Sequence, residues 1–263
     1  MSLDLNTVVT ALFEFGVEHV LVKDFHRTGY NLLPELIDPR AELICGYHSG
    51  PVPGIGEAMD AQAVMFLGMH AASGTDGFLA HTLTSRIARL EVNGKPLSEV
   101  ELFASALAPF GVRPIFFSGC PVACEQAEAA MPNILTYSIN KEAGFTRFDV
   151  ELWRSGLTRA AVEALGNEQT LPHQPEGPFT ALVKMRDGDA VAQKLAERWN
   201  LSCQDDRILL TAAGMRELYT ALIRICYLTP LVEKIMPACL IAYNLWGRLG
   251  LAWVRRQAKK RPD

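Results

Sequence analysis

Short apolar runs alternate along the chain with segments whose apolar residues recur every three or four positions. The runs predict buried strands, and the periodic segments predict amphipathic helices. Strands are predicted at 17–22, 41–46, 63–68, 113–119, 179–185 and 207–211. Helices are predicted at 7–15, 98–110, 121–131, 189–199 and 215–228. Strands that alternate with helices predict an α/β fold with a mostly parallel sheet flanked by helices.

Helix-capping and turn residues lie at the expected ends of these elements. Gly16 follows the first helix as a C-terminal cap, and Ser98 precedes the helix that ends near Gly111. Asn93-Gly94 lies inside the segment 89–96, where a type I′ turn would join two strands of a hairpin.

A polar stretch rich in proline and glycine, residues 166–178, is the best candidate for a linker. It divides an α/β domain at 1–165, which would carry the functional site, from a smaller C-terminal βαβα unit at 179–228. Residues 229–263 form an apolar and basic C-terminal tail that is expected to be helical.

Within the tail, residues 235–254 are apolar except for Asn244 and Arg248, and a basic run follows. The favoured interpretation is a terminal apolar helix packed against the domain or against another subunit. The alternative is an interfacial helix, over 235–261, whose basic end meets anionic lipid. Pro237 and Arg248 leave too short a clean stretch for a membrane span.

The composition is that of an ordinary soluble enzyme, with 49% hydrophobic and 21% charged residues. A net charge of −4 gives no electrostatic case for binding nucleic acid. The opening residues, 1–9, do not resemble a signal peptide, so a cytoplasmic location is expected. The six cysteines are scattered and are expected to be mostly buried thiols. A zinc–cysteine site is the disfavoured alternative.

Three of the six histidines fall just after predicted strands. His26 follows the strand at 17–22, His70 follows the strand at 63–68, and His81 ends the loop that leaves that same strand. Ligands gather beyond the carboxyl ends of strands in α/β sheets. Glu99 opens the helix after the hairpin, and Asp24 comes two residues before His26.

Neutral imidazoles and carboxylates are the ligands of hydrolytic zinc sites. A further histidine can then act as acid, base or nucleophile. The small residues between His70 and His81 would let a substrate approach the backbone closely.

Each of these residues also has an ordinary structural interpretation. Glu99 alone would be a first-turn carboxylate favoured by the helix dipole. Asp24 would be a turn residue or a partner that orients a ligand histidine. The other histidines, His19, His48 and His173, are expected to be solvated or hydrogen-bonded.

Three blocks of the chain, in order and spacing, resemble the zinc D-aminopeptidases of the dipeptide-transport type. They read VLVKDFHRTGYNLLPELI, AVMFLGMHAASGTDGFLAHT and LEVNGKPLSEVEL. The resemblance extends from about residue 4 to about residue 228. It implies a ring-shaped homo-oligomer with two zinc ions that removes N-terminal D-residues from short peptides such as D-Ala-D-Ala.

Position by position, the resemblance implies that His26, His70 and Glu99 bind zinc and that His81 is the catalytic histidine. His81 would be the nucleophile proposed in that family. From the residues alone it could equally be a general base that acts through metal-bound water.

The sequence departs from the family pattern at three places. The segment 118–124, SGCPVAC, lacks an acidic residue after its glycine, and 139–148 replaces a more regular basic segment. The family also opens with a strand that ends in Asp-x-Glu and completes the two-zinc site. Here Asp4 is expected inside the first helix and Asn6 stands where the glutamate is needed, so that strand and both carboxylates would be missing, through truncation, start assignment or natural variation. Three remaining ligands would hold one zinc.

Three functions follow from this reading. The first is a cytoplasmic, oligomeric, metal-dependent aminopeptidase whose activity the missing carboxylates would weaken. The alternative is a catalytically degraded homologue that binds a peptide or a protein partner in the same cleft. A third is a peripheral membrane or assembly protein that uses its C-terminal tail.

Overall fold

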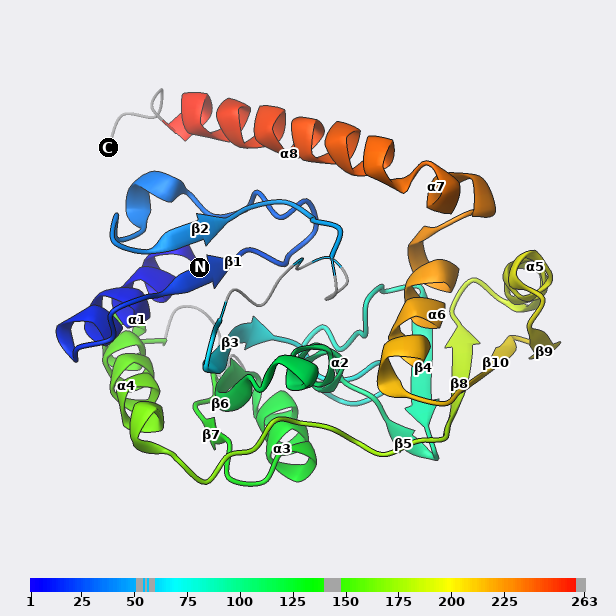
Figure 1. The fold of residues 1–263 in the computed structure, drawn as a ribbon, viewed down its shortest axis with the longest axis horizontal. Coiled ribbons are helices and arrows are strands. Elements are labelled where there is room, and N and C mark those ends of the chain that lie inside the picture. The colour runs from blue at the N-terminus through cyan, green and yellow to red at the C-terminus, as the bar shows by residue number, and fades with distance from the viewer. Residues whose placement is uncertain (51–53, 55, 57–59, 140–147, 259–263) are drawn as a thin grey trace. The chain divides into compact units, whose positions relative to one another are not determined.

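The structure is a computed structural model that describes residues 1–50, 54, 56, 60–139 and 148–258. The chain divides into two compact units, coloured along the chain in Figure 1. Unit 1 consists of residues 1–61 together with 231–263, and unit 2 consists of residues 62–230. The predicted boundaries at 1–165, 166–178, 179–228 and 229–263 stay a prediction.

Unit 1 is built around two short parallel strands. β1 (Leu21–Lys23) pairs with β2 (Glu42–Ile44), and α1 (Ser2–Glu14) precedes them. Val9, Val22 and Leu32 form the buried centre of this unit. The strand predicted at 17–22 shortens to three residues because only Leu21–Lys23 are paired with β2. Asp4 lies within α1, as predicted, and α1 begins five residues before the predicted helix at 7–15, so that it also includes Asn6.

Unit 1 is completed by two helices from the C-terminal end of the chain. α7 (Pro230–Lys234) is a short turn of helix, and α8 (Met236–Ala258) is the longest helix described. The predicted helical tail is therefore confirmed over the described residues. Among all the residues that the structure describes, no helix is long and apolar enough to cross a membrane.

A parallel sheet forms the first half of unit 2. Its strands lie in the order β3 (Ala63–Met69), β6 (Arg113–Gly119) and β7 (Leu135–Thr136). α2 (Glu99–Leu107) packs against β3 and β6, and α3 (Pro121–Ala130) packs against β6 and β7. Ile115, Phe116 and Phe117 of β6 are all buried. Parallel strands flanked by helices confirm the predicted α/β class.

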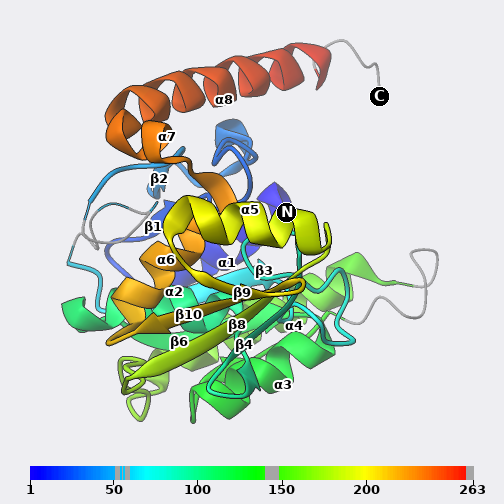
Figure 2. The same cartoon turned by 90° about the vertical axis from the view of Figure 1, so that its right-hand side faces the viewer.

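A five-stranded antiparallel sheet forms the second half of unit 2. It contains β5 (Lys95–Pro96), β4 (Ile87–Val92), β8 (Phe179–Met185), β10 (Arg207–Ala212) and β9 (Ser202–Gln204), in that order. α5 (Asp189–Trp199) and α6 (Met215–Tyr227) both pack against β8 and β10, as Figure 2 shows.

This sheet contains both the predicted hairpin and the predicted βαβα unit. Asn93 and Gly94 have φ values of 50° and 80°, as a type I′ turn requires. Beyond the prediction, β4 pairs with β8, so the hairpin and the C-terminal elements share one sheet.

One helix was not predicted. α4 (Val150–Glu163) begins after Asp149, whose carboxylate accepts a hydrogen bond from the Leu152 N–H at 2.9 Å. α4 packs against β7. Its buried residues are Gly156, Leu157, Ala160 and Ala161, which form too weak an apolar stripe to predict a helix from periodicity.

All six cysteines are free thiols. Cys120 and Cys124 are buried and the other four are partly buried, so the expectation of buried thiols is confirmed in full only for Cys120 and Cys124. The four exceptions lie on short strands, on strand ends or on helix faces that reach the surface of their unit.

Candidate active site

The loop between β3 and β4 brings His70 and His81 together. A β-bulge at Gly68, whose φ is 75°, interrupts β3 just before His70. The chain then turns back, and the His81 N–H donates to the Ala71 carbonyl at 3.0 Å. The centroids of the two imidazole rings lie 4.6 Å apart. The loop therefore closes on itself, and its two histidines meet at the closure.

Buried polar bonds hold this closure. The Thr82 N–H donates to Ser73 Oγ at 2.7 Å, and the Ser73 N–H donates to Thr82 Oγ1 at 3.1 Å. The Thr82 hydroxyl also donates to the Leu97 carbonyl at 2.8 Å, which ties the loop to the residues just before α2. Ser73 and Thr82 are at most 1% exposed. Bonds without competing water fix the loop firmly.

The small residues of the loop serve its packing. Ala71, Ala72 and Ser73 are buried. A Cβ at Gly77 would lie 2.3 Å from the Cβ of Ala71, so only glycine fits there. Ala71–Ser73 and Gly77 therefore serve the packing of the loop, and the expected approach of a substrate to the loop backbone stays a prediction.

A side chain from α3 holds the loop from the other side. Gln126 Oε1 accepts the Ala72 N–H at 2.9 Å, and Gln126 Nε2 donates to Thr75 Oγ1 at 3.2 Å. Both ends of one amide are thus used on the loop, which fixes it relative to the parallel sheet.

Both imidazoles are oriented by backbone carbonyls. His70 Nδ1 lies 3.0 Å from the Phe78 carbonyl oxygen, and His81 Nδ1 lies 2.8 Å from the Leu79 carbonyl oxygen. A carbonyl only accepts, so each Nδ1 carries a proton. In the neutral rings the lone pair is therefore on Nε2. A backbone carbonyl that fixes the tautomer in this way is typical of metal-binding histidines.

Glu99 lies close to His81 at the start of α2. Its Oε1 accepts the Leu83 N–H at 3.0 Å. Burial raises the pKa of Glu99, while the charge of His81 and the Leu83 N–H oppose that rise. The start of the helix is fixed because both the N–H and the hydroxyl of Ser98 donate to the Glu101 carboxylate. An acceptor of raised pKa beside an imidazole is suited to binding a cation or exchanging a proton.

The backbone on either side of His81 is strained. Leu79 and Leu83 have φ values of 51° and 63°, in the left-handed region that disfavours a leucine. Leu83 is held on both sides, since its N–H donates to Glu99 and its carbonyl accepts the Tyr227 hydroxyl. Strain that surrounding bonds maintain in this way is common at functional sites.

Sequence reasoning did not find the contribution of α6. Tyr227 reaches Leu83 from the end of that helix, and burial raises the pKa of the neighbouring Cys226 thiol to about 12. Glu99 also raises the pKa of Cys226, so a protonated thiol lies near the carboxylate. Tyr227 and Cys226 come close to Leu83 and Glu99 only because α6 packs against α2. No sequence motif therefore identifies either residue.

His26 and Asp24 belong to unit 1, while His70, His81 and Glu99 belong to unit 2. The Asp24 carboxylate accepts backbone N–H bonds from His26 at 3.2 Å, from Asn31 and from Leu32 at 3.1 Å. Asp24 is 5% exposed. It therefore organises the loop that carries His26.

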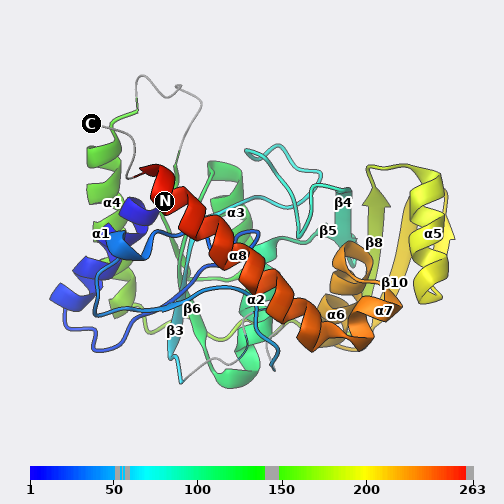
Figure 3. The same cartoon turned by 90° about the horizontal axis from the view of Figure 1, so that it is seen from above.

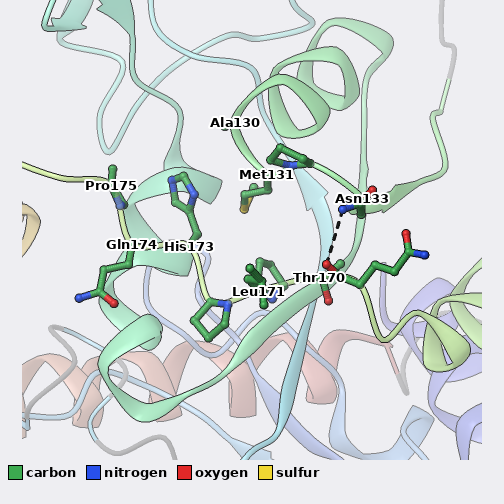
Figure 4. Close-up of a pocket in the computed structure, with 12 residues that line it drawn as sticks. Ala130, Met131, Asn133, Thr170, Leu171, His173, Gln174 and Pro175 are labelled. Atoms are coloured by element: carbon green, nitrogen blue, oxygen red, sulfur yellow. Dashed lines mark hydrogen bonds between the residues drawn. The ribbon is translucent and has the colours of Figure 1, made fainter.

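A separate cavity of about 400 Å³ lies at the end of α3, between 130–133 and 169–175 (Figure 4). It shares no residue with the histidine loop. His173 lines it, and burial lowers the pKa of that imidazole. The remaining histidines fit their predicted ordinary roles, since His48 Nε2 lies 3.0 Å from the Cys45 carbonyl oxygen and His19 is exposed.

The donor types of His70 and Glu99 fit a zinc ion. An imidazole whose Nδ1 is held by a carbonyl and a carboxylate beside it are both typical zinc ligands. Within the described residues, no group of three or more His, Cys, Asp or Glu side chains is arranged to hold a metal ion. The metal and catalytic roles of His26, His70, His81 and Glu99 stay predictions. The variable segment at 139–148 lies almost wholly outside the described residues.

Comparisons with known proteins agree on one family. A family model described as D-aminopeptidase matches residues 1–223. A D-aminopeptidase of Bacillus subtilis (strain 168) is 28% identical over 232 residues, which cover 85% of this chain and 83% of the relative. The fold resembles that of the zinc-dependent D-aminopeptidase DppA from Bacillus subtilis, described as a self-compartmentalizing protease. That match has a TM-score of 0.75 at 22% identity and covers 85% of this chain and 84% of the other.

Proposed function

The chain belongs to the D-aminopeptidase family of peptidases, and we propose that it is a metal-dependent aminopeptidase that removes N-terminal D-residues from short peptides. The family match supports the peptidase activity. The preference for D-residues and the use of zinc are proposed from the descriptions of the Bacillus subtilis relative and of the Bacillus subtilis structure that the fold resembles.

The observation that carries the proposal is the closure that sets His70 against His81 beside Glu99. Buried hydrogen bonds and a close-packed glycine maintain it, and they hold two leucines in strained backbone conformations. A loop that only connected two strands would need none of these.

His70 and Glu99 are proposed to bind zinc through Nε2 and the carboxylate. The same role for His26 rests on the sequence resemblance alone. A bound zinc ion, one or two per chain, would polarise the substrate carbonyl and lower the pKa of a bound water. The Leu83 N–H keeps the Glu99 carboxylate in place, and the Phe78 carbonyl keeps the His70 ring in place.

His81 is proposed as the catalytic residue. Its Nδ1 proton is held by the Leu79 carbonyl, which leaves Nε2 to take a proton as the substrate carbonyl is attacked and to return it to the leaving amine. Attack by Nε2 itself on the carbonyl would use the same lone pair, and the peptide C–N bond would break as the protonated amine leaves an acyl-imidazole that water then hydrolyses. Phe78 and Leu79, both exposed beside His81, would contact an apolar part of the substrate.

The proposed assembly is a homo-oligomer. The description of the Bacillus subtilis structure as self-compartmentalizing supports this, because such a protease encloses its sites within an assembly.

His81→Ala tests the proposal, with His48→Ala as the matched control. We expect His81→Ala to lower kcat for D-Ala-D-Ala by at least about 100-fold, the usual contribution of a general acid–base group. Zinc per chain, measured by elemental analysis, should not change. Unchanged turnover in His81→Ala would contradict the proposal.

The same zinc-loaded protein also tests the alternative function, that of a homologue that binds a peptide without cleaving it. A zinc-loaded protein that binds the dipeptide in calorimetry without hydrolysing it would favour a peptide-binding homologue. Loss of zinc in Glu99→Gln, with the fold retained, would support the metal site independently of turnover.

A further inference from the structure

The helix α8 is attached to its unit through its polar side. Asn244 accepts the Tyr47 N–H and donates to the Tyr47 carbonyl, each at 2.9 Å. Arg248 donates to the Tyr30 hydroxyl at 3.2 Å, and Arg255 pairs with Glu35 at 3.0 Å. Gly247 is buried on the same side of α8 and packs against the Tyr30 ring. A Cβ at this position would lie 2.3 Å from that ring.

The side of α8 that is turned away from Asn244 is mostly apolar and exposed, with Ile241 at its border beside Arg248 and Arg256 at its C-terminal end. Residues three, four and seven positions apart share a helix face. The large side chains of this face are 57–72% exposed, and they are Ile241, Leu245, Trp246, Leu249 and Trp253. Ala238, Ala242 and Ala252 fill the same face. Figure 3 shows α8 along its length. An exposed apolar face of this size on a helix that is attached through its polar side chains indicates a site of contact with another apolar surface.

Charge is segregated onto the same segment. Residues 236–261 contain six basic residues and no acidic one, namely Arg248, Arg255, Arg256, Lys259, Lys260 and Arg261. The whole chain carries −4, so the rest of the chain carries −10. The protein is thus acidic, and its one strongly basic segment also holds its exposed apolar face.

We propose that α8 lies in the plane of an anionic membrane surface. Its apolar face would enter the boundary between headgroups and acyl chains, and its basic end would pair with anionic headgroups. Trp246 and Trp253, seven residues apart on that face, are the side chain that concentrates at membrane interfaces. No helix among the described residues is long and apolar enough to cross a membrane, so the proposal is for a surface position and not for a span.

A lipid surface fits this helix better than a second copy of it. Two copies paired through α8 would offer no carboxylate to either basic segment, since 236–261 contains none. An anionic membrane supplies both, because its acyl chains give the apolar boundary and its headgroups give the missing negative charge.

Vesicle co-sedimentation of the full chain tests the proposal. The vesicles contain phosphatidylcholine alone, or phosphatidylcholine with about one third phosphatidylglycerol. We expect binding to the anionic vesicles only, a blue shift of tryptophan emission on binding, and a loss of binding as salt screens the charges.

Two variants locate the contact. Leu249→Glu should weaken binding at least about ten-fold, because it places a charge in the centre of the apolar face. Arg256→Gln should weaken it about five-fold, the effect of one basic residue near an anionic surface. Leu152→Glu on α4 is the matched control, since that leucine is 72% exposed in unit 2 and should leave binding unchanged.

The outcomes separate the possible occupants. Binding that Leu249→Glu abolishes and Leu152→Glu does not supports the proposal. Absence of binding, or equal binding to both kinds of vesicle, overturns it. If Leu249→Glu instead lowers the molar mass in light scattering and no vesicle binds, the face joins copies of the chain and the proposal is wrong.

Discussion

Replacing Gly77 by alanine should open the loop that brings His70 and His81 together. The new Cβ would lie 2.3 Å from the Cβ of Ala71 and 3.3 Å from Cys120 Sγ. Carbon atoms pack at about 3.5–4.0 Å, so the two loop segments must separate by about 1.5 Å. Ala71 is fully buried and cannot yield, so the segment at 77–79 moves.

This movement reaches the histidines directly. The carbonyls of Phe78 and Leu79 orient His70 and His81 at 3.0 and 2.8 Å. A shift of about 1.5 Å takes these contacts beyond hydrogen-bond distance. Overpacking of this kind costs about 1–3 kcal/mol of unfolding free energy. A displacement of about 1 Å at a catalytic group lowers turnover about 100-fold.

Urea unfolding and dipeptide hydrolysis measure the two effects in the same variants. Ala71→Gly removes the opposing Cβ, so the double variant Ala71→Gly/Gly77→Ala should recover most of the lost stability and turnover. Gly166→Ala, which meets no atom within 4 Å, is the control and should change the unfolding free energy by less than about 0.5 kcal/mol. Additive losses in the double variant, or normal turnover in Gly77→Ala, would refute the reasoning.

Three further predictions concern pH and the residues around Leu83. Burial lowers the pKa of Lys23 to about 8, so between about pH 8 and 10.5 the folded protein binds fewer protons than the unfolded chain. The unfolding free energy of the parent relative to Lys23→Met should therefore rise with pH across that window, as measured by urea unfolding at several pH values. Burial raises the pKa of Glu99, so metal-free Glu99→Gln should be more stable than the parent at pH 7, and the difference should vanish on acidification below its ordinary pKa. Tyr227→Phe removes a donor to Leu83 and should lower kcat with KM unchanged, at a cost below about 1 kcal/mol in unfolding, measured by steady-state kinetics and urea.

The elements that the sequence predicts best are those whose local pattern matches their environment. β6, β8 and α5 occupy the predicted residues, because β6 is an apolar run buried on both faces and β8 alternates buried and less buried positions. The hairpin turn follows from two residues that tolerate positive φ.

Pairing between distant segments is not visible in such patterns. β4 finds its partner β8 about ninety positions along the chain, and no local feature specifies that antiparallel contact. α4 was missed because glycine and alanine fill its buried stripe. β9 was missed because three residues at a sheet edge carry no periodic signal.

The candidate site shows the same division. The positions of His70, His81 and Glu99 after predicted elements marked them as candidates, and a short loop brings the two histidines together. The bond from Tyr227 to Leu83 depends on tertiary packing across 144 positions, which sequence spacing does not reveal.

The pairing of β4 with β8 also sets the order in which the site can mature during synthesis. His70, His81 and Glu99 leave the ribosome well before residues 179–185. Until then one edge of β4, the strand between the histidine loop and α2, is unpaired. On that edge Leu90 later pairs with Val183 and Val92 with Ala181, both in β8. Tyr227 arrives later still. A nascent chain therefore carries its catalytic candidates beside an unpaired strand edge, and folding of the site is completed only when the C-terminal half of unit 2 has emerged.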